Sequence, residues 1–168
     1  MESDGTIATA VARKGGRGVV VDRKASFMVQ EFRKFGMNVV GVSETERFGR
    51  DIYDVDGFLI LHSGRPVPGT GEKVERNEGV GIVMNPSMVS CWKNGGEVWN
   101  PVSSRIVSAR LKLSDQAAVA PTRGRSQPLF VSVVSVYAPT HRASQEDKDQ
   151  FFDDLQGVVD GISADFFK

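Results

Sequence analysis

The spacing of apolar residues predicts an amphipathic helix over residues 24–35. Met28, Phe32 and Phe35 lie at positions i, i+4 and i+7, which places them on one face of an α-helix. Gly36 follows directly, and glycine is common just after the last residue of a helix. We therefore expect this helix to end at Phe35.

A second, longer helix is predicted near the carboxyl end of the sequence. Ser144 stands three residues before Asp147, the pattern of an N-cap residue followed by an acidic first turn. Apolar residues then recur at helical spacing and are expected to form the buried face: Phe151, Leu155, Val158 and Ile162.

The other apolar segments are short and predict strands. Residues 107–113 alternate apolar and polar side chains, the period of a strand with one face in water. The further predicted strands are residues 37–42, 52–53, 58–62, 81–84, 88–92 and 129–137. Residues 64–79 predict a long exposed loop and residues 114–128 a mobile connection, because neither segment has a period.

Polar residues stand at the end of the first predicted strand. Residues 37–42 are apolar and rich in valine, which is typical of a buried strand that follows a helix in an α/β unit. Ser43, Glu44 and Thr45 come next. Open α/β sheets usually bind their ligands at the carboxyl ends of strands, so these residues are candidates for chemistry.

Composition narrows the class of protein. The chain has 168 residues, of which 40% are hydrophobic and 25% charged, enough for one ordinary globular domain or part of one. Its formal net charge is zero, which excludes a globally basic nucleic-acid binder but not a local phosphate-binding face. Cys91 is the single cysteine, so a disulfide or a thiolate zinc cluster within the chain is excluded.

The sequence also suggests the cellular compartment of the protein and the boundaries of its domain. The single cysteine favours a reducing, intracellular compartment, either nuclear or cytoplasmic. No apolar stretch approaches the roughly 20 residues that a membrane span needs. Residues 1–22 lack the apolar segment of a secretory signal and are expected to form a loose arm, with a partial domain over residues 23–168.

Three segments, in this order, resemble the endonuclease/exonuclease/phosphatase superfamily, which has the DNase I-like fold. They are NVVGVSETERF at 38–48, GVGIV at 79–83 and VVSVYAPT at 133–140. The craniofacial development protein 2-like group and the endonuclease domains of LINE-type retrotransposons are the most similar members. Further segments that match this group are GRPVPG at 64–69, WK at 92–93, GGE at 95–97 and SSR at 103–105. The resemblance covers residues 23–162.

The resemblance implies an α/β fold, a DNase I-like sandwich of two sheets with helices outside. Because the superfamily continues beyond the last predicted helix, we expect a truncated version with mainly the first sheet and two helices. Uncovered apolar faces and strand edges would then favour self-association.

The resemblance assigns two catalytic residues. Glu44 matches the carboxylate that binds the metal, and we expect it to coordinate Mg²⁺ (or Mn²⁺), an ion that accepts one or two carboxylates and keeps much of its water. A solvated glutamate in a turn is the alternative. Tyr137 matches the tyrosine that approaches the scissile phosphate, where a phenol can donate a hydrogen bond. A strand-end tyrosine with a buried ring is the alternative.

Four basic residues are candidates for contact with nucleic-acid phosphates: Arg65, Lys73, Arg76 and Arg105. An arginine at the start of an alternating strand, as Arg105 is, is more often a surface residue. Neither His62 nor His141 matches the catalytic histidine of the superfamily, so we interpret both as exposed or structural.

The function that the resemblance implies is metal-dependent hydrolysis of phosphodiesters, with DNA as the substrate. The superfamily also carries Gly-Asp-x-Asn and Asp-His segments that activate water, and these are absent from the chain. Water activation needs a positioned base, so we expect the chain as given to be catalytically incomplete. A noncatalytic interaction module or a retroelement remnant on the same scaffold are the alternatives.

Overall fold

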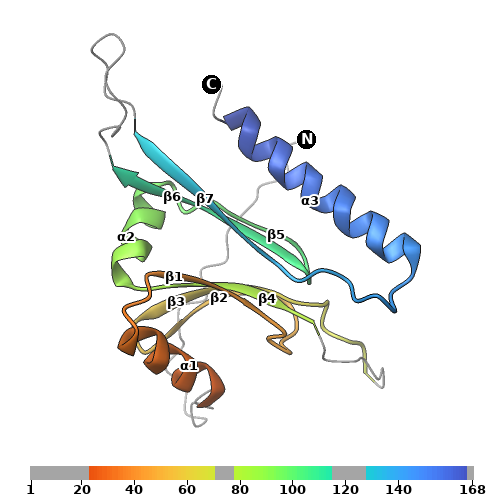
Figure 1. The fold of residues 1–168 in the computed structure, drawn as a ribbon. Coiled ribbons are helices and arrows are strands. Elements are labelled where there is room, and N and C mark those ends of the chain that lie inside the picture. Colours follow the sequence, from red (N-terminus) through yellow and green to blue (C-terminus); the bar gives the residue numbers. More distant parts are fainter. Residues whose placement is uncertain (1–22, 71–77, 115–127, 166–168) are drawn as a thin grey trace.

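The described part of the chain folds into two antiparallel sheets and three helices (Figure 1). The computed structural model describes residues 23–70, 78–114 and 128–165. The predicted arm at 1–22 and most of the connection predicted at 114–128 lie outside the described residues. The elements in chain order are α1 Arg23–Lys34, β1 Val39–Ser43, β2 Arg50–Val55, β3 Phe58–Ser63, β4 Val80–Met84, α2 Pro86–Asn94, β5 Trp99–Ser103, β6 Ile106–Ser114, β7 Leu129–Val136 and α3 Gln145–Asp165.

One sheet has four strands in the order β1-β4-β3-β2, and the other has three in the order β5-β6-β7. Every neighbouring pair of these strands is antiparallel. The prediction of a buried strand over residues 37–42 is wrong, since β1 is an edge strand that pairs antiparallel with β4 and is only half-buried or exposed. Strand β4 is apolar on both faces and is buried on both sides. The three-stranded sheet covers one face of the four-stranded sheet, and α1 covers the other.

The main core lies between the two sheets. It includes Leu61 and Ile82 from the four-stranded sheet, Val107 and Leu111 from the three-stranded sheet, and Trp92 from α2. Val107, Ala109 and Leu111 are the inward positions of the alternating strand predicted at 107–113, and all three are buried. The predicted alternation is thus confirmed, although Leu113 at its end is exposed.

Helix α1 covers the outer face of the four-stranded sheet. Ala25 and Val29 are buried against Phe58, Ile60 and Val83. The helix ends as predicted, because Gly36 adopts a positive φ of 65° and the amide of Met37 donates back to the carbonyl of Phe32. Phe35, expected on the buried face, is 66% exposed because the face in contact with the sheet lies nearer Ala25 and Val29.

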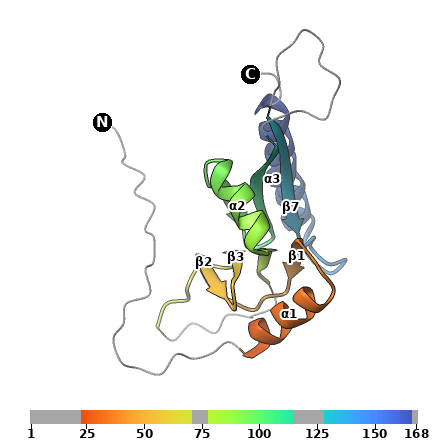
Figure 2. The ribbon, with the colours of Figure 1, turned by 90° about the vertical axis from the view of Figure 1, so that its left-hand side faces the viewer.

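Helix α3 covers the outer face of the three-stranded sheet. The side-chain oxygen of Ser144 accepts a hydrogen bond from the Asp147 amide at 3.0 Å, so the predicted N-cap is confirmed. The predicted face is confirmed as well, because Phe151 and Val158 are buried in one cluster with Ile106. Leu155 and Ile162 pack at its rim. Figure 2 shows α3 behind β7 and α1 beneath the four-stranded sheet.

Three sequence predictions about elements are wrong. Residues 88–92 belong to α2 and not to a strand, because Asn85 caps the helix by accepting from the Met88 amide and Pro86 occupies its first turn. Strand β5 was not predicted. The loop predicted as exposed at 64–79 is buried at its ends, since Gly64, Glu78 and Gly79 are buried.

The expectation of mainly one sheet and two helices is also wrong. Both sheets are present and pack face to face, with α1 and α3 on the two outer faces (Figure 1). The result is a mixed α/β sandwich, and the outer faces of both sheets have a helix packed on them. Self-association stays a prediction. No helix in the described ranges combines the length and the apolar character that a membrane crossing requires.

Candidate functional site

Glu44 directly follows β1 and lies in a turn at the edge of the four-stranded sheet. Its φ of 55° is in the left-handed region, which is uncommon for a residue with a side chain and persists only where neighbours enforce it. Main-chain hydrogen bonds hold the residues that follow Glu44. The amide of Thr45 donates to the carbonyl of Gly79 at 3.2 Å, and the amide of Glu46 donates to the carbonyl of Glu78 at 3.1 Å. The turn therefore presents an exposed Glu44 carboxylate.

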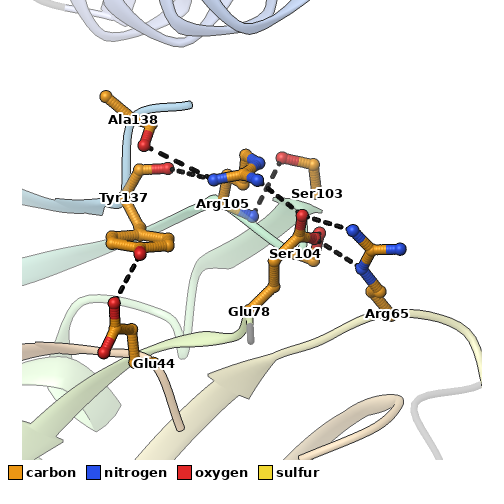
Figure 3. A network of polar contacts seen from close by, with 8 residues as sticks. All are labelled: Glu44, Arg65, Glu78, Ser103, Ser104, Arg105, Tyr137 and Ala138. Carbon is orange, nitrogen blue, oxygen red and sulfur yellow. Dashed lines mark hydrogen bonds and ion pairs between the residues drawn. The ribbon is translucent and has the colours of Figure 1, made fainter. Parts of the chain in front are cut away.

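Tyr137 directly follows β7 on the other sheet and reaches Glu44. Its hydroxyl donates a short hydrogen bond to Oε1 of Glu44, although the two residues are 93 positions apart (Figure 3). This bond, together with the charge of Glu44 and some burial, raises the pKa of the Tyr137 phenol. The phenol therefore keeps its proton at neutral pH and can donate it in a hydrogen bond.

The packing of β1 against β7 brings these two strand ends together. Gly41 in β1 faces Ser135 in β7, and a Cβ atom at position 41 would lie 3.1 Å from the Ser135 hydroxyl oxygen. That hydroxyl donates to the carbonyl of Val42 at 3.3 Å. Because β1 and β7 meet at these residues, Glu44 and Tyr137 leave the two sheets at the same edge.

A buried carboxylate, that of Glu78, lies beside this pair. Glu78 is 7% exposed, and its oxygens accept hydrogen bonds from Arg65 Nε at 2.8 Å, Ser104 Oγ at 2.6 Å and Arg105 at 2.5 Å (Figure 3). Burial alone would raise the pKa of Glu78, but the hydrogen bonds from Arg65 and Ser104 and the charge of Arg105 outweigh burial and lower it. Glu78 is therefore ionised at neutral pH.

Arg105 connects Glu78 with Tyr137. Its guanidinium donates to the carbonyls of Tyr137 at 3.2 Å and Ala138 at 3.4 Å, and it lies 5.3 Å from the centroid of the Tyr137 ring. In return, the amide of Tyr137 donates to the carbonyl of Arg105 at 2.8 Å. Arg105 thus contacts both the main chain and the ring of the residue that touches Glu44.

His62 supports the Glu44 turn from β3. It is 1% exposed, and its Nε2 lies 2.8 Å from the hydroxyl of Thr45, while its buried Nδ1 has no partner among the described residues. Burial, aided by the nearby charge of Arg47, lowers the pKa of His62 to about 4. The histidine is neutral at pH 7, in agreement with its interpretation as a structural residue.

The site offers one carboxylate to a metal ion. Within the described ranges, no group of three His, Cys, Asp or Glu side chains is placed to hold a metal. Glu44 uses Oε1 for Tyr137, and no hydrogen bond or ion pair from a described residue reaches its Oε2. This donor set fits a largely hydrated Mg²⁺ that takes one protein carboxylate and substrate phosphate oxygens, and it does not fit a metal enclosed by protein ligands.

The structure brings four of the six predicted site residues into one network. Glu44 and Tyr137 touch each other, while Arg65 and Arg105 both bind Glu78. Lys73 and Arg76 lie outside the described residues. Their predicted roles in metal and nucleic-acid binding stay predictions.

Glu78 was not predicted, and the reason is its sequence context. It follows a stretch of charged residues in a segment that predicts an exposed loop, where a glutamate is ordinarily solvated. The available signal was its position two residues before the wholly apolar strand β4, where burial begins. A carboxylate placed there requires cationic partners, and Arg65 and Arg105 both lie within segments that match the resemblance.

Comparison with known proteins gives one distant similarity. Over 137 residues, 82% of this chain, the sequence is 24% identical to craniofacial development protein 2 of Bos taurus. The chain spans 19% of the length of that protein. No protein-family model and no solved structure matches the chain. The similarity suggests a related family and agrees with the resemblance in the sequence.

Proposed function

We propose that the chain carries the metal-binding and phosphate-binding part of a phosphodiester hydrolase site of the endonuclease type. Glu44 is the metal carboxylate. The Tyr137 hydroxyl, whose single proton is donated to Glu44 in the structure, rotates its O–H to donate to a nonbridging oxygen of a bound phosphate. The observation that supports this proposal is the contact between the Tyr137 hydroxyl and the Glu44 carboxylate, which come from different sheets. A carboxylate and a neutral phenol at one exposed edge suit an ion and the phosphate bound to it.

A divalent ion held by Glu44 would supply charge stabilisation to the phosphate and to the departing oxygen. The protein's own contribution is to place the carboxylate and the phenol. The left-handed turn at Glu44 and the pairing of its neighbours with Gly79 and Glu78 fix the carboxylate. The Tyr137 phenol is protonated at neutral pH, as an ordinary tyrosine is, and its pKa is raised further, so it offers a donor and no negative charge to an approaching phosphate.

We propose DNA as the substrate class, with basic side chains around the pair as phosphate contacts. Arg65 has the more accessible guanidinium, since its side chain is 41% exposed against 23% for Arg105. Both already share the Glu78 carboxylate, so their net charge toward a ligand is reduced. Lys73 and Arg76, on the segment that follows Arg65, are the further candidates. The binding that results depends on salt, as phosphate contacts do.

A second candidate function is binding without hydrolysis, and the positions of the histidines favour it. Hydrolysis needs a base that activates water within hydrogen-bond reach. His62 is buried and bonded to Thr45, and His141 is exposed, with its carbonyl accepting from Lys148. Neither contacts Glu44 or Tyr137 among the described residues. The same site could then bind a metal and a phosphodiester as an interaction module.

One experiment separates the two candidates. Supercoiled plasmid is incubated with Mg²⁺ and the wild type, Glu44→Gln or Glu97→Gln, and oligonucleotide binding is measured in parallel by fluorescence anisotropy with Ca²⁺. Glu97 is a matched control because it is an exposed glutamate that also has a φ of 57°, in the turn between α2 and β5.

For a hydrolase we expect nicking by wild type and Glu97→Gln and only background nicking by Glu44→Gln. Background nicking by all three, with binding that requires Glu44, supports the interaction module. Nicking and binding that are the same in all three chains would contradict both candidates.

A further inference from the structure

Arg105 was a candidate for contact with phosphate, but its surroundings show a guanidinium that is already engaged. One nitrogen donates to the carbonyls of Tyr137 and Ala138, and another binds the buried carboxylate of Glu78. Its side chain is 23% exposed. The fork of the guanidinium therefore joins one carboxylate to the main chain at the end of β7 (Figure 3).

These contacts restrict Tyr137 in both its main chain and its ring. The amide of Tyr137 donates to the carbonyl of Arg105 at 2.8 Å, and the carbonyl of Tyr137 accepts from the guanidinium at 3.2 Å. The guanidinium also lies 5.3 Å from the ring centroid. A tyrosine at a strand end with both main-chain groups bonded to the same residue has little freedom to move its hydroxyl away from Glu44.

Glu78 ties the same arrangement to the turn that carries Glu44. Its carboxylate holds Arg105, while its main-chain carbonyl accepts the amide of Glu46 at 3.1 Å. Gly79 accepts the amide of Thr45, and its own amide donates to the carbonyl of Ser104. Glu78 and its neighbour therefore contact both sides of the pair formed by Glu44 and Tyr137.

The cost of burying these charges favours a positioning role over simple stabilisation. A buried ion pair often contributes little to stability, because desolvation offsets the attraction between the charges. Arg65 and Ser104 already satisfy Glu78 without Arg105. Glu78 therefore does not need Arg105 as a second arginine partner. The contacts of Arg105 with the main chain and ring of Tyr137 indicate that its role is to restrict Tyr137.

We propose that Arg105, anchored by Glu78, is a positioning residue that holds the Tyr137 phenol against Glu44. This inference rests on the proposed function, since the place of the phenol matters only where a metal and a phosphate bind. Its test uses neither metal nor nucleic acid. The positioning role can therefore fail while the proposed function stands, and the proposed function can fail while the positioning role stands.

The experiment is a double-mutant cycle measured by chemical denaturation. Glu44→Ala, Tyr137→Phe and the combined variant are compared with the parent, and the coupling between the two positions is taken from the four unfolding equilibria. The cycle is then repeated in Arg105→Gln and in Arg65→Gln. Arg65→Gln is the matched control, because it also removes an arginine from Glu78 but leaves the contacts between Arg105 and Tyr137 in place.

We expect a coupling of about tenfold in the unfolding equilibrium constant for a hydrogen bond to a charged group. The coupling should persist in Arg65→Gln and disappear in Arg105→Gln. A loss of overall stability alone would leave the coupling unchanged, so the cycle distinguishes positioning from a structural role. If Arg105→Gln does not fold, Arg105→Lys serves, since an ammonium keeps the charge near Glu78 but lacks the fork.

A coupling of the same size in the parent and in the Arg105 variant would overturn the proposal. So would the absence of coupling in the parent, because the phenol would then not be held against Glu44 at all.

Discussion

At the scale of single residues, the candidate site depends on side chains whose chemistry is set by their neighbours. Glu44 and Tyr137 come from motifs, so their identity and order could be read in the sequence. Their contact required the packing of Gly41 against Ser135, which no local pattern reveals. Glu78 could not be identified beforehand, because its burial and its cationic partners come from distant parts of the chain.

His62 makes the stability of the fold dependent on pH. Its pKa is about 4 in the folded chain, below the ordinary value of 6.5, because the neutral ring is buried. The unfolded chain therefore binds more protons between these values, and stability falls as pH decreases from above 6.5 to about 4. The loss amounts to about 3 kcal/mol at most.

The measurement is urea denaturation of the wild type between pH 7 and pH 4, with His62→Gln and His141→Gln in parallel. We expect the loss of stability with acid to be smaller in His62→Gln and unchanged in His141→Gln, whose ring is exposed. An equal acid dependence in the wild type and His62→Gln would show that another group is responsible.

At the scale of elements, capping and spacing predicted α1 and α3, and alternation predicted β6. The start and the buried face of α3 were read correctly because Ser144 and the apolar spacing are local signals. Helix α2 was misread as a strand, because a short apolar segment fits either structure. Strand β5 was missed because it contains Asn100 and Pro101 and has little apolar pattern.

The turn before β4 should tolerate only glycine at position 79. Gly79 has a φ of 115°, and a Cβ atom there would lie 2.2 Å from the hydroxyl oxygen of Thr45. Gly79→Ala is expected to destabilise the fold by about 1–3 kcal/mol from backbone strain, with a further loss from displacement of Thr45.

The control for this change is Gly57→Ala. Gly57 also has a positive φ, of 85°, but no atom lies within 4 Å of the added Cβ. Denaturation curves should show a larger loss of stability for Gly79→Ala, and equal losses in the two variants would mean that the contact with Thr45 has no effect.

At the scale of the whole molecule, two sheets pack on each other with a helix on each outer face (Figure 1). The resemblance predicted a sandwich of two sheets correctly at this coarse level. It also led to the wrong expectation of mainly one sheet. The reason is that the second sheet was expected to come from superfamily segments that lie beyond the last predicted helix. Strands β5, β6 and β7 form that sheet from residues in the chain itself.

We expect α3 and the core between the sheets to unfold together. Phe151 is 5% exposed and packs with Ile106, whose strand also supplies Val107 to the core between the sheets. Phe151→Ala should lower stability by about 3–5 kcal/mol. The fluorescence of Trp92 and Trp99, which both pack in the core between the sheets, reports that core, and far-ultraviolet circular dichroism reports the helices. Both transitions should therefore shift to the same lower midpoint. Separate midpoints would mean that α3 unfolds independently.

The assignment of Glu44 as a metal ligand is tested most directly by titration of the chain with Mn²⁺, with the free ion followed by electron paramagnetic resonance. Mn²⁺ takes the same oxygen ligands as Mg²⁺. We expect wild type and Glu97→Gln to bind Mn²⁺ at a site that Glu44→Gln lacks. Identical binding curves for wild type and Glu44→Gln would contradict the assignment.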